Sequence, residues 1–145
     1  MAYKLPDGYT VRGLTQADLV QLVPFLSKFR GENVDEAKLP AEVYGGLANG
    51  TVYVPTAFLH GEAVACGIVY APSGANRCAH IFQAYAEPFV PADVTAYMFD
   101  LIERWARMLG ARGITAATRR RELRVFYEKY RLRPVGVVLE RLFET

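Results

Sequence analysis

The spacing of apolar residues in the N-terminal third of the chain changes from the period of a strand to that of a helix. Residues 9–14 alternate as a short strand does. A helix is predicted next, with Thr15 as its N-cap and Asp18 in the place of the usual capping-box glutamate. Its apolar stripe consists of Leu19, Leu22, Val23, Leu26 and Phe29. Because Pro24 removes one backbone hydrogen bond, we expect a kink in this helix.

The rest of the pattern predicts strands, then a long helix, then a β-α-β ending. A weaker helix covers residues 35–47, and strands at 52–60 and 63–70 flank Gly61-Glu62, a glycine-first pair suited to a tight turn. A strand at 78–86 precedes the strongest helix, which Asp93 is predicted to cap. The apolar stripe of that helix is Val94, Met98, Leu101, Trp105 and Met108. A strand at 114–118, a helix at about 121–131 and a final strand follow.

The element order is therefore β-α-α-β-β-β-α-β-α-β. A run of hairpin strands followed by a β-α-β unit implies an α/β (mixed α+β) fold with a mixed, mostly antiparallel sheet and helices on both faces. No internal repeat or linker divides the sequence, so we expect one domain over residues 1–145.

Composition narrows the class of function. Apolar residues make up 52% of the 145 residues and charged residues 22%, which is typical of globular proteins. No apolar run approaches the roughly 20 residues that span a bilayer, and the N-terminus lacks a signal-peptide pattern, so we expect a cytoplasmic protein without a membrane partner. A net charge of +2 gives little support to nucleic-acid binding. Cys66 and Cys78 lack metal-ligand spacing, so no metal site is predicted.

The most specific motif is the segment from Phe126 to Pro134, which reads FYEKYRLRP between two strand-like runs. It resembles the C-terminal signature of the GCN5-related N-acetyltransferases (GNAT family), and the element order is similar to that family over nearly the whole chain. The resemblance implies an acetyl-CoA co-substrate and makes Tyr127 the acid that protonates the coenzyme A thiolate. The alternative is that Phe126, Tyr127 and Tyr130 only form the apolar face of a helix.

The resemblance also locates a donor site at the end of the strand 78–86. In the family, the backbone there aligns the thioester, which implies that role for Gln83, Ala84, Tyr85 and Ala86. The family's pyrophosphate loop has Arg or Gln, two residues, Gly, one residue, then Gly or Ala, and its N–H groups face the phosphates. Residues 87–94 contain none of these glycines, and Asp93 would put a carboxylate where a phosphate belongs.

Charged residues near this strand supply the remaining candidates. Arg120, Arg121 and Arg124 could hold the phosphates in place of the loop, since arginine forks match phosphate oxygens. A solvated basic turn and a docking patch for an acidic partner are the alternatives. Glu87 is the candidate for relaying the amine proton, unless it is only a surface glutamate. His80 is a second candidate base, and an odd offset of seven puts it opposite Glu87 unless a bulge intervenes.

Two functions from different classes follow. The first is an N-acyltransferase that moves an acetyl group from acetyl-CoA to an amine of a small molecule or protein. The second is a catalytically degenerate module with the same fold that binds and modulates a partner protein. The Tyr127 segment favours the enzyme, and the glycine-free loop favours the module. The sequence does not identify the acceptor or an oligomeric state.

Overall fold

The computed structural model describes residues 4–29, 35–75, 77–116 and 130–132. Within these ranges the chain forms one six-stranded sheet with helices packed on it. In chain order the elements are β1 (Tyr9–Gly13), the 3₁₀ helix η1 (Gln16–Phe25), α1 (Leu39–Asn49), β2 (Val52–Tyr53), β3 (Pro55–Leu59), β4 (Glu62–Tyr70), β5 (Cys78–Ala86), α2 (Ala92–Met108) and β6 (Gly113–Ala116). The predicted order is confirmed as far as β6. The predicted helix at 121–131 and the final strand lie almost wholly outside the described residues.

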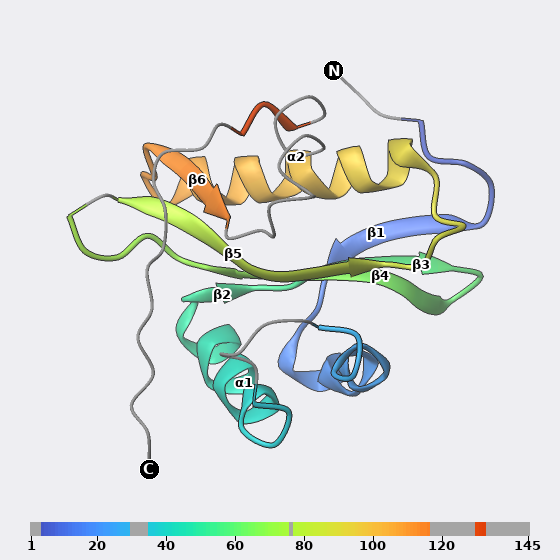
Figure 1. Ribbon diagram of the computed structural model, residues 1–145, viewed down its shortest axis with the longest axis horizontal. Helices are drawn as coiled ribbons and strands as arrows, with labels where there is room; N and C mark the ends of the chain where they lie inside the picture. Colours follow the sequence, from blue (N-terminus) through green and yellow to red (C-terminus); the bar gives the residue numbers. More distant parts are fainter. Residues whose placement is uncertain (1–3, 30–34, 76, 117–129, 133–145) are drawn as a thin grey trace, which may run out of the picture.

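The sheet has the strand order β1-β3-β4-β5-β6, and β2 pairs with β4. The β5–β6 pair is parallel and the other pairs are antiparallel. Helix α2 covers one face of the sheet, whereas η1 and α1 cover the other (Figure 1). The predicted mixed sheet with helices on both faces is therefore confirmed. No helix within the described ranges has both the length and the apolar character that a membrane crossing needs.

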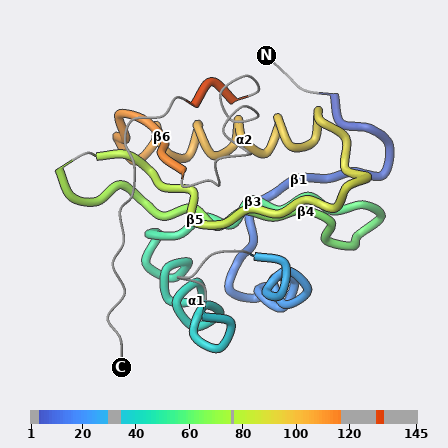
Figure 2. The backbone as a smooth tube through the Cα atoms, viewed as in Figure 1, coloured from blue at the N-terminus to red at the C-terminus, as the bar shows by residue number. Residues whose placement is uncertain are grey.

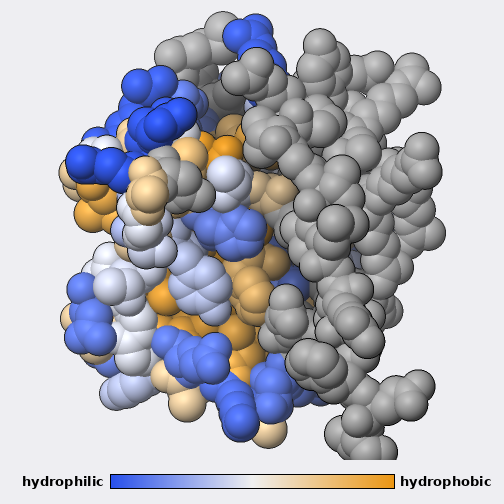
Figure 3. All heavy atoms as spheres, turned by 60° about the vertical axis from the view of Figure 1, so that its left-hand side comes forward, coloured by the Kyte–Doolittle hydropathy of each residue, from blue (hydrophilic) through white to orange (hydrophobic). Residues whose placement is uncertain are grey.

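Apolar side chains fill both layers between the sheet and its helices. The layer under η1 and α1 includes Leu22, Phe25, Val43 and Ile68, and the layer under α2 includes Val94 and Met98. From the side of β6 and α1, hydrophobic residues are visible between bands of hydrophilic ones (Figure 3). The apolar interior thus reaches the surface on this side of the molecule.

The first helix differs from its prediction, because η1 is a 3₁₀ helix. With three residues per turn, side chains at i and i+3 share a face. Leu22 and Phe25 are accordingly buried, whereas Val23 is 57% exposed. The predicted burial of Val23 was wrong because the 3.6-residue period does not apply here. Thr15 is the N-cap as predicted, and its N–H donates to the Asp18 carboxylate at 2.6 Å.

The turn between β3 and β4 and the C-terminal end of α1 also differ from the prediction. The β3–β4 turn is His60-Gly61 rather than Gly61-Glu62: both residues have positive φ, and Leu59 pairs with Glu62. In α1, Pro40 lies in the first turn, where a missing N–H costs no helical hydrogen bond, and Gly50 ends the helix in the left-handed conformation.

Helix α2 confirms its two predicted ion pairs, but of its predicted apolar stripe only Val94 and Met98 are buried. The ion pairs Asp100–Arg104 and Glu103–Arg107 join at 2.8 and 3.0 Å. The buried stripe follows the i, i+4 spacing and consists of Val94, Met98, Ile102 and Ala106. Met108, predicted to face the core, is 83% exposed because it is the last residue of the helix and lies off this stripe.

Candidate active site

Strand β5 contains a bulge in its middle. Its pairing with β4 runs in register from Ala86 to Gln83, then resumes at Ile81, so that Phe82 is the extra residue. A bulge of this kind reverses the alternation of side chains beyond it. Residues on the two sides of the bulge that would face opposite layers in a regular strand therefore share one layer.

Beyond the bulge, β5 runs on past the four residues of β6 that the structure describes. The parallel pairing joins Cys78–Ile81 of β5 to residues 113–116 of β6, and β5 runs on to Ala86. Figure 2 shows β5 continuing along the sheet past the described part of β6. Residues Gln83 to Ala86, the predicted thioester-aligning segment, form this extension.

On the side of the sheet that η1 and α1 cover, Tyr85 and Glu87 form a hydrogen-bonded pair next to the Phe25 ring. The Tyr85 hydroxyl donates a hydrogen bond to Glu87 Oε2 at 3.3 Å. The Tyr85 ring lies 6.2 Å from the Phe25 ring, and Lys28 Nζ lies 5.8 Å from its centroid. Glu87 is half-buried. The structure thus brings the predicted Glu87 and Tyr85 together and adds Lys28, a cation from the turn after η1 that the sequence analysis did not select.

His80 lies at the other end of the same face. It is half-buried, and its Nδ1 lies 2.8 Å from the hydroxyl of Thr115 on β6. Burial lowers the pKa of the imidazole below its ordinary value of 6.5. Tyr70, its register partner on β4, packs into the layer under η1 and α1, as do Phe82 and Tyr85. The expectation that His80 and Glu87 oppose each other applied to a strand without a bulge, and the bulge at Phe82 is the exception that it allowed.

The loop between β5 and α2 does not form the family's phosphate cradle. Pro88 and Pro91 have no N–H, while the N–H groups of Glu87 and Val90 donate to backbone carbonyls at 3.0 Å each. The Phe89 N–H is the one loop amide outside these bonds. The residues of this loop therefore do not fit a pyrophosphate held by successive amides.

Asp93 is not the N-cap of α2, contrary to the prediction. The cap is Pro91, which has extended backbone angles, and the helix begins at Ala92. Asp93 is exposed in the first turn and makes no capping hydrogen bond. Its carboxylate still lies at the positive end of the helix, where it competes with a phosphate by charge rather than by occupying a capping site.

Several predicted site residues lie outside the described residues. These are Tyr127 and the three arginines Arg120, Arg121 and Arg124. Tyr130, three residues after Tyr127, is described, and its ring stacks on Phe99 of α2 at 4.9 Å between centroids. Within the described ranges, no group of three or more His, Cys, Asp or Glu residues is arranged to hold a metal ion.

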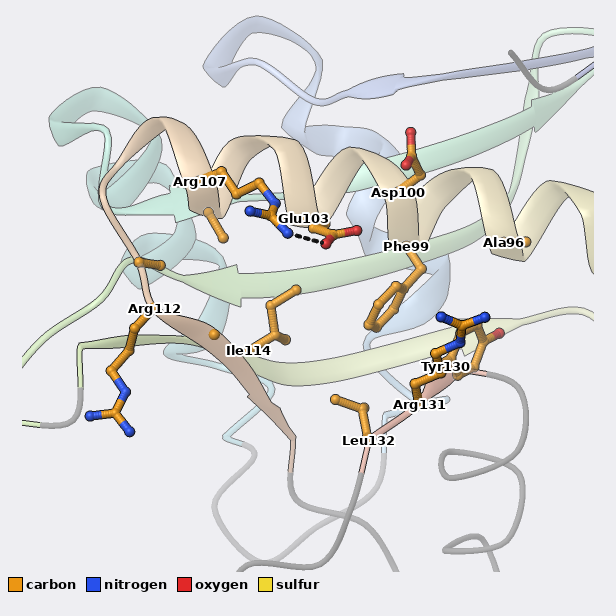
Figure 4. A pocket seen from close by; sticks show the side chains of 13 residues that line it. Ala96, Phe99, Asp100, Glu103, Arg107, Arg112, Ile114, Tyr130, Arg131 and Leu132 are labelled. Carbon is orange, nitrogen blue, oxygen red and sulfur yellow. Dashed lines mark hydrogen bonds and ion pairs between the residues drawn. The ribbon is translucent and has the colours of Figure 1, made fainter. Parts of the chain in front are cut away.

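A cavity of about 700 Å³ lies away from this face, between α2, β6 and residues 130–132. Figure 4 shows Phe99 and Glu103 of α2 on one side of it, with Tyr130 and Leu132 across from them. Its α2 residues start at Ala96 and extend to Arg107, so the cavity borders the helix beyond the first turn that follows the loop. We therefore do not assign the donor site to this cavity.

Comparison with known proteins identifies the fold. No family model matches the sequence, and none of the curated proteins is similar to it. The aminoglycoside N-acetyltransferase AAC(6')-Iy in complex with CoA has a TM-score of 0.77 at 14% identity, over 96% of this chain and 99% of that one. A predicted acetyltransferase from Clostridium acetobutylicum with acetyl-CoA has a TM-score of 0.74 at 18% identity, over 92% and 96%.

A third solved structure agrees with these two. The aminoglycoside 6'-N-acetyltransferase AAC(6')-Ih from Acinetobacter baumannii has a TM-score of 0.76 at 9% identity, over 95% of this chain and 99% of that one. The structure therefore has the fold of the acyl-CoA N-acyltransferases. More narrowly, the chain has the GNAT fold that its sequence pattern predicted.

Proposed function

We propose that this protein is an N-acetyltransferase that moves an acetyl group from acetyl-CoA to an amine of a small molecule or protein. The observation that carries the proposal is the fold that this chain shares with solved acetyltransferases, with a bulge in β5 beside the predicted thioester-aligning segment. The amide-rich pantetheine arm of coenzyme A can pair with strand backbone as an added strand does, and we propose that it follows residues 83–86. The names of the structural neighbours, which include aminoglycoside acetyltransferases, support an amine acceptor.

Each proposed site residue has a separate task in this reaction. The backbone from Gln83 to Ala86 aligns the thioester with the amine, which reduces the entropic part of the barrier. Tyr127 protonates the departing thiolate. Glu87, at the mouth of the site, passes the amine proton towards solvent, and its hydrogen bond from Tyr85 fixes the carboxylate orientation.

The phosphates need a different partner from the family's loop. We propose that Arg120, Arg121 and Arg124 hold them, because guanidinium groups supply paired donors that match phosphate oxygens. The first turn of α2 then contributes little to binding, since Asp93 offsets its positive end.

The second candidate function is a degenerate module that binds and modulates a partner protein. One observation favours it: Phe89, in the loop where the phosphates would lie, is 59% exposed. An exposed aromatic side chain beside prolines is suited to a protein contact and unsuited to a phosphate.

A thiol-release assay tests the proposal. Purified protein is incubated with acetyl-CoA and a panel of amines comprising aminoglycosides, polyamines and lysine peptides, and free coenzyme A is measured. We expect release that depends on both protein and amine, together with acetylated product by mass spectrometry. Release with no amine of the panel would favour the partner-binding module.

A further inference from the structure

Helix α1 contains two adjacent glycines, Gly45 and Gly46, although glycine destabilises the middle of a helix. Gly46 has a packing reason, because a Cβ atom there would lie 2.2 Å from Cγ2 of Val52. Gly45 has no such reason among the described residues. Its φ lies outside the left-handed region, and a Cβ atom there would have no neighbouring atom within 4 Å. Packing and backbone conformation therefore do not account for Gly45, and the space over it stays open.

This open space is part of a groove of about 570 Å³ beside α1. Glu42, Gly45 and Asn49 are spaced three and four residues apart, so they share the helix face that lines it. The rest of the described lining comes from residues 41, 46, 51–52 and 70–73, and the N–H of Ala71 donates to the Thr51 carbonyl at 2.8 Å. Figure 1 shows α1 next to β2 on the face of the sheet opposite α2. Binding sites of about 300–1,000 Å³ take small molecules, so the groove has room for one.

The polar groups of the groove carry negative charge. Among the described lining residues Glu42 is the one charged side chain, and no ion pair within the described ranges involves it. Tyr70 lines the same groove, and its ring is held by Phe82 of β5 at 5.3 Å between centroids. Burial and the nearby Glu42 carboxylate raise the pKa of the Tyr70 phenol, so this hydroxyl stays neutral. The groove thus combines a carboxylate with the ring of a neutral phenol.

The end of α1 adds to this negative potential. The C-terminus of a helix carries a partial negative charge, which a basic residue in the last turn often offsets. The last turn of α1 contains no basic residue, and Asn49, its last residue, lines the groove. An anion would therefore meet the Glu42 carboxylate and the negative helix end with no cation in the described lining to hold it. A carboxylate beside an aromatic ring is instead suited to an ammonium group.

From these observations we propose that the groove over Gly45 is a binding site for a small organic ammonium ion, of the polyamine or amino-sugar class. The charged nitrogen lies against Glu42 and the Tyr70 ring, and the carbon chain or sugar ring occupies the space that the missing side chain of Gly45 leaves. None of the described lining residues belongs to the segment 83–87, so this site is separate from the one proposed for acetyl transfer. Its test contains no acetyl-CoA, and its result is independent of the thiol-release assay.

Titration calorimetry of the full chain at low salt measures the binding. The probes are spermidine, a linear polyamine, and neamine, an amino sugar, and inositol serves as a polyol without charge. We expect saturable 1:1 binding of at least one amine, weaker at high salt, and no binding of inositol. The tighter of the two amines identifies the class. Binding of neither amine, or equal binding of inositol, would overturn the proposal.

The charge is tested with Glu42→Gln, which keeps the size of the side chain. We expect the affinity for the amine to fall by about tenfold or more, the effect of losing a charge-assisted hydrogen bond. Glu62→Gln is the matched control, because Glu62 is exposed on β4 and does not line the groove. It should leave the affinity unchanged. Equal affinities of wild type and Glu42→Gln would remove Glu42 from the site and overturn the proposal.

The space is tested with Gly45→Leu, which fills the groove and should abolish binding. Ala48→Leu adds the same side chain at an exposed position of α1 outside the groove and should bind as wild type does. Gly45→Ala adds one carbon atom to open space and should raise the melting temperature, because alanine is the better helix former. Binding by Gly45→Leu as tight as by Ala48→Leu would overturn the proposal. A lower melting temperature of Gly45→Ala would also overturn it, since Gly45 would then be needed for packing.

Discussion

Tyr127 would give its proton to the sulfur of coenzyme A as the thioester breaks. A phenol has an ordinary pKa near 10, yet it can protonate a thiolate whose basicity resembles that of free cysteine, because the proton moves as charge develops. Replacing Tyr127 with Phe keeps the ring and removes the proton. We expect turnover to fall by roughly 10²-fold, with little change in melting temperature or in acetyl-CoA affinity.

Tyr130 offers a matched control for this substitution. The Tyr130 ring stacks on Phe99, so Tyr130→Phe keeps this packing. The substitution removes a hydroxyl that is only three residues from Tyr127 in the sequence. We expect this variant to retain wild-type turnover. Full activity in Tyr127→Phe would show that another group protonates the thiolate.

Asp93 tests how the phosphates of acetyl-CoA are held. The carboxylate is exposed in the first turn of α2 and makes no capping bond. Asp93→Asn removes a negative charge from the positive helix end, so acetyl-CoA should bind about two- to fivefold more tightly. Titration calorimetry at low salt measures this change. A drop in melting temperature without tighter binding would mean that the carboxylate serves only the helix.

At the scale of elements, the start of η1 depends on Asp18. Partial burial raises the pKa of its carboxyl, but the hydrogen bond from the Thr15 N–H and the neighbouring Arg12 outweigh burial, and the pKa lies below 3.8. Asp18→Ala should therefore lower the free energy of unfolding by about 1 kcal/mol at pH 7.

The pH dependence of this effect has a defined sign. Because the folded-state pKa of Asp18 is lowered, its contribution is complete above the unfolded-state pKa and is lost as pH falls through the folded-state value. Urea unfolding at pH 7 and at pH 3 should show a difference between wild type and Asp18→Ala that shrinks in acid. Arg12→Gln separates the ion pair from the cap. A difference that is constant with pH would contradict the assignment to a charged carboxylate.

Hydrophobic spacing predicted which elements form but not their finer geometry. Spacing alone does not separate a 3₁₀ helix from an α-helix over ten residues, so Val23 was placed in the core although it is exposed. The bulge at Phe82 was beyond prediction, because an extra residue in a strand leaves the apolar pattern of an aromatic-rich segment unchanged. That one residue decides the face of His80.

Parts of the site could be predicted because their signals are local. Glu87 directly follows β5 and is two residues after Tyr85, so their contact follows from the spacing of side chains along an extended chain. Lys28 and Thr115 come from elements distant in sequence, and nothing in their local sequence marks them. Thr115 is 35 residues from His80, and only the parallel pairing of β5 with β6 brings them together.

At the scale of the whole molecule, the sheet separates two tasks. The α2 side ends in the loop and helix start where a donor's phosphates would lie, and the η1 and α1 side presents His80, Tyr85 and Glu87. A donor that follows the edge of β5 would meet an acceptor arriving from the η1 and α1 side (Figure 1). This arrangement is the central claim, and it requires that the protein bind acetyl-CoA although its loop lacks glycine.

Titration calorimetry of the purified protein with acetyl-CoA tests this claim most directly. The account predicts saturable 1:1 binding, weakened in Arg120→Ala by about 1.5–3 kcal/mol, the contribution of a charge-assisted hydrogen bond. Binding that is equal in wild type and Arg120→Ala would remove that arginine from the site. No binding to the wild type at any accessible concentration would contradict the account and leave a fold that serves partner binding.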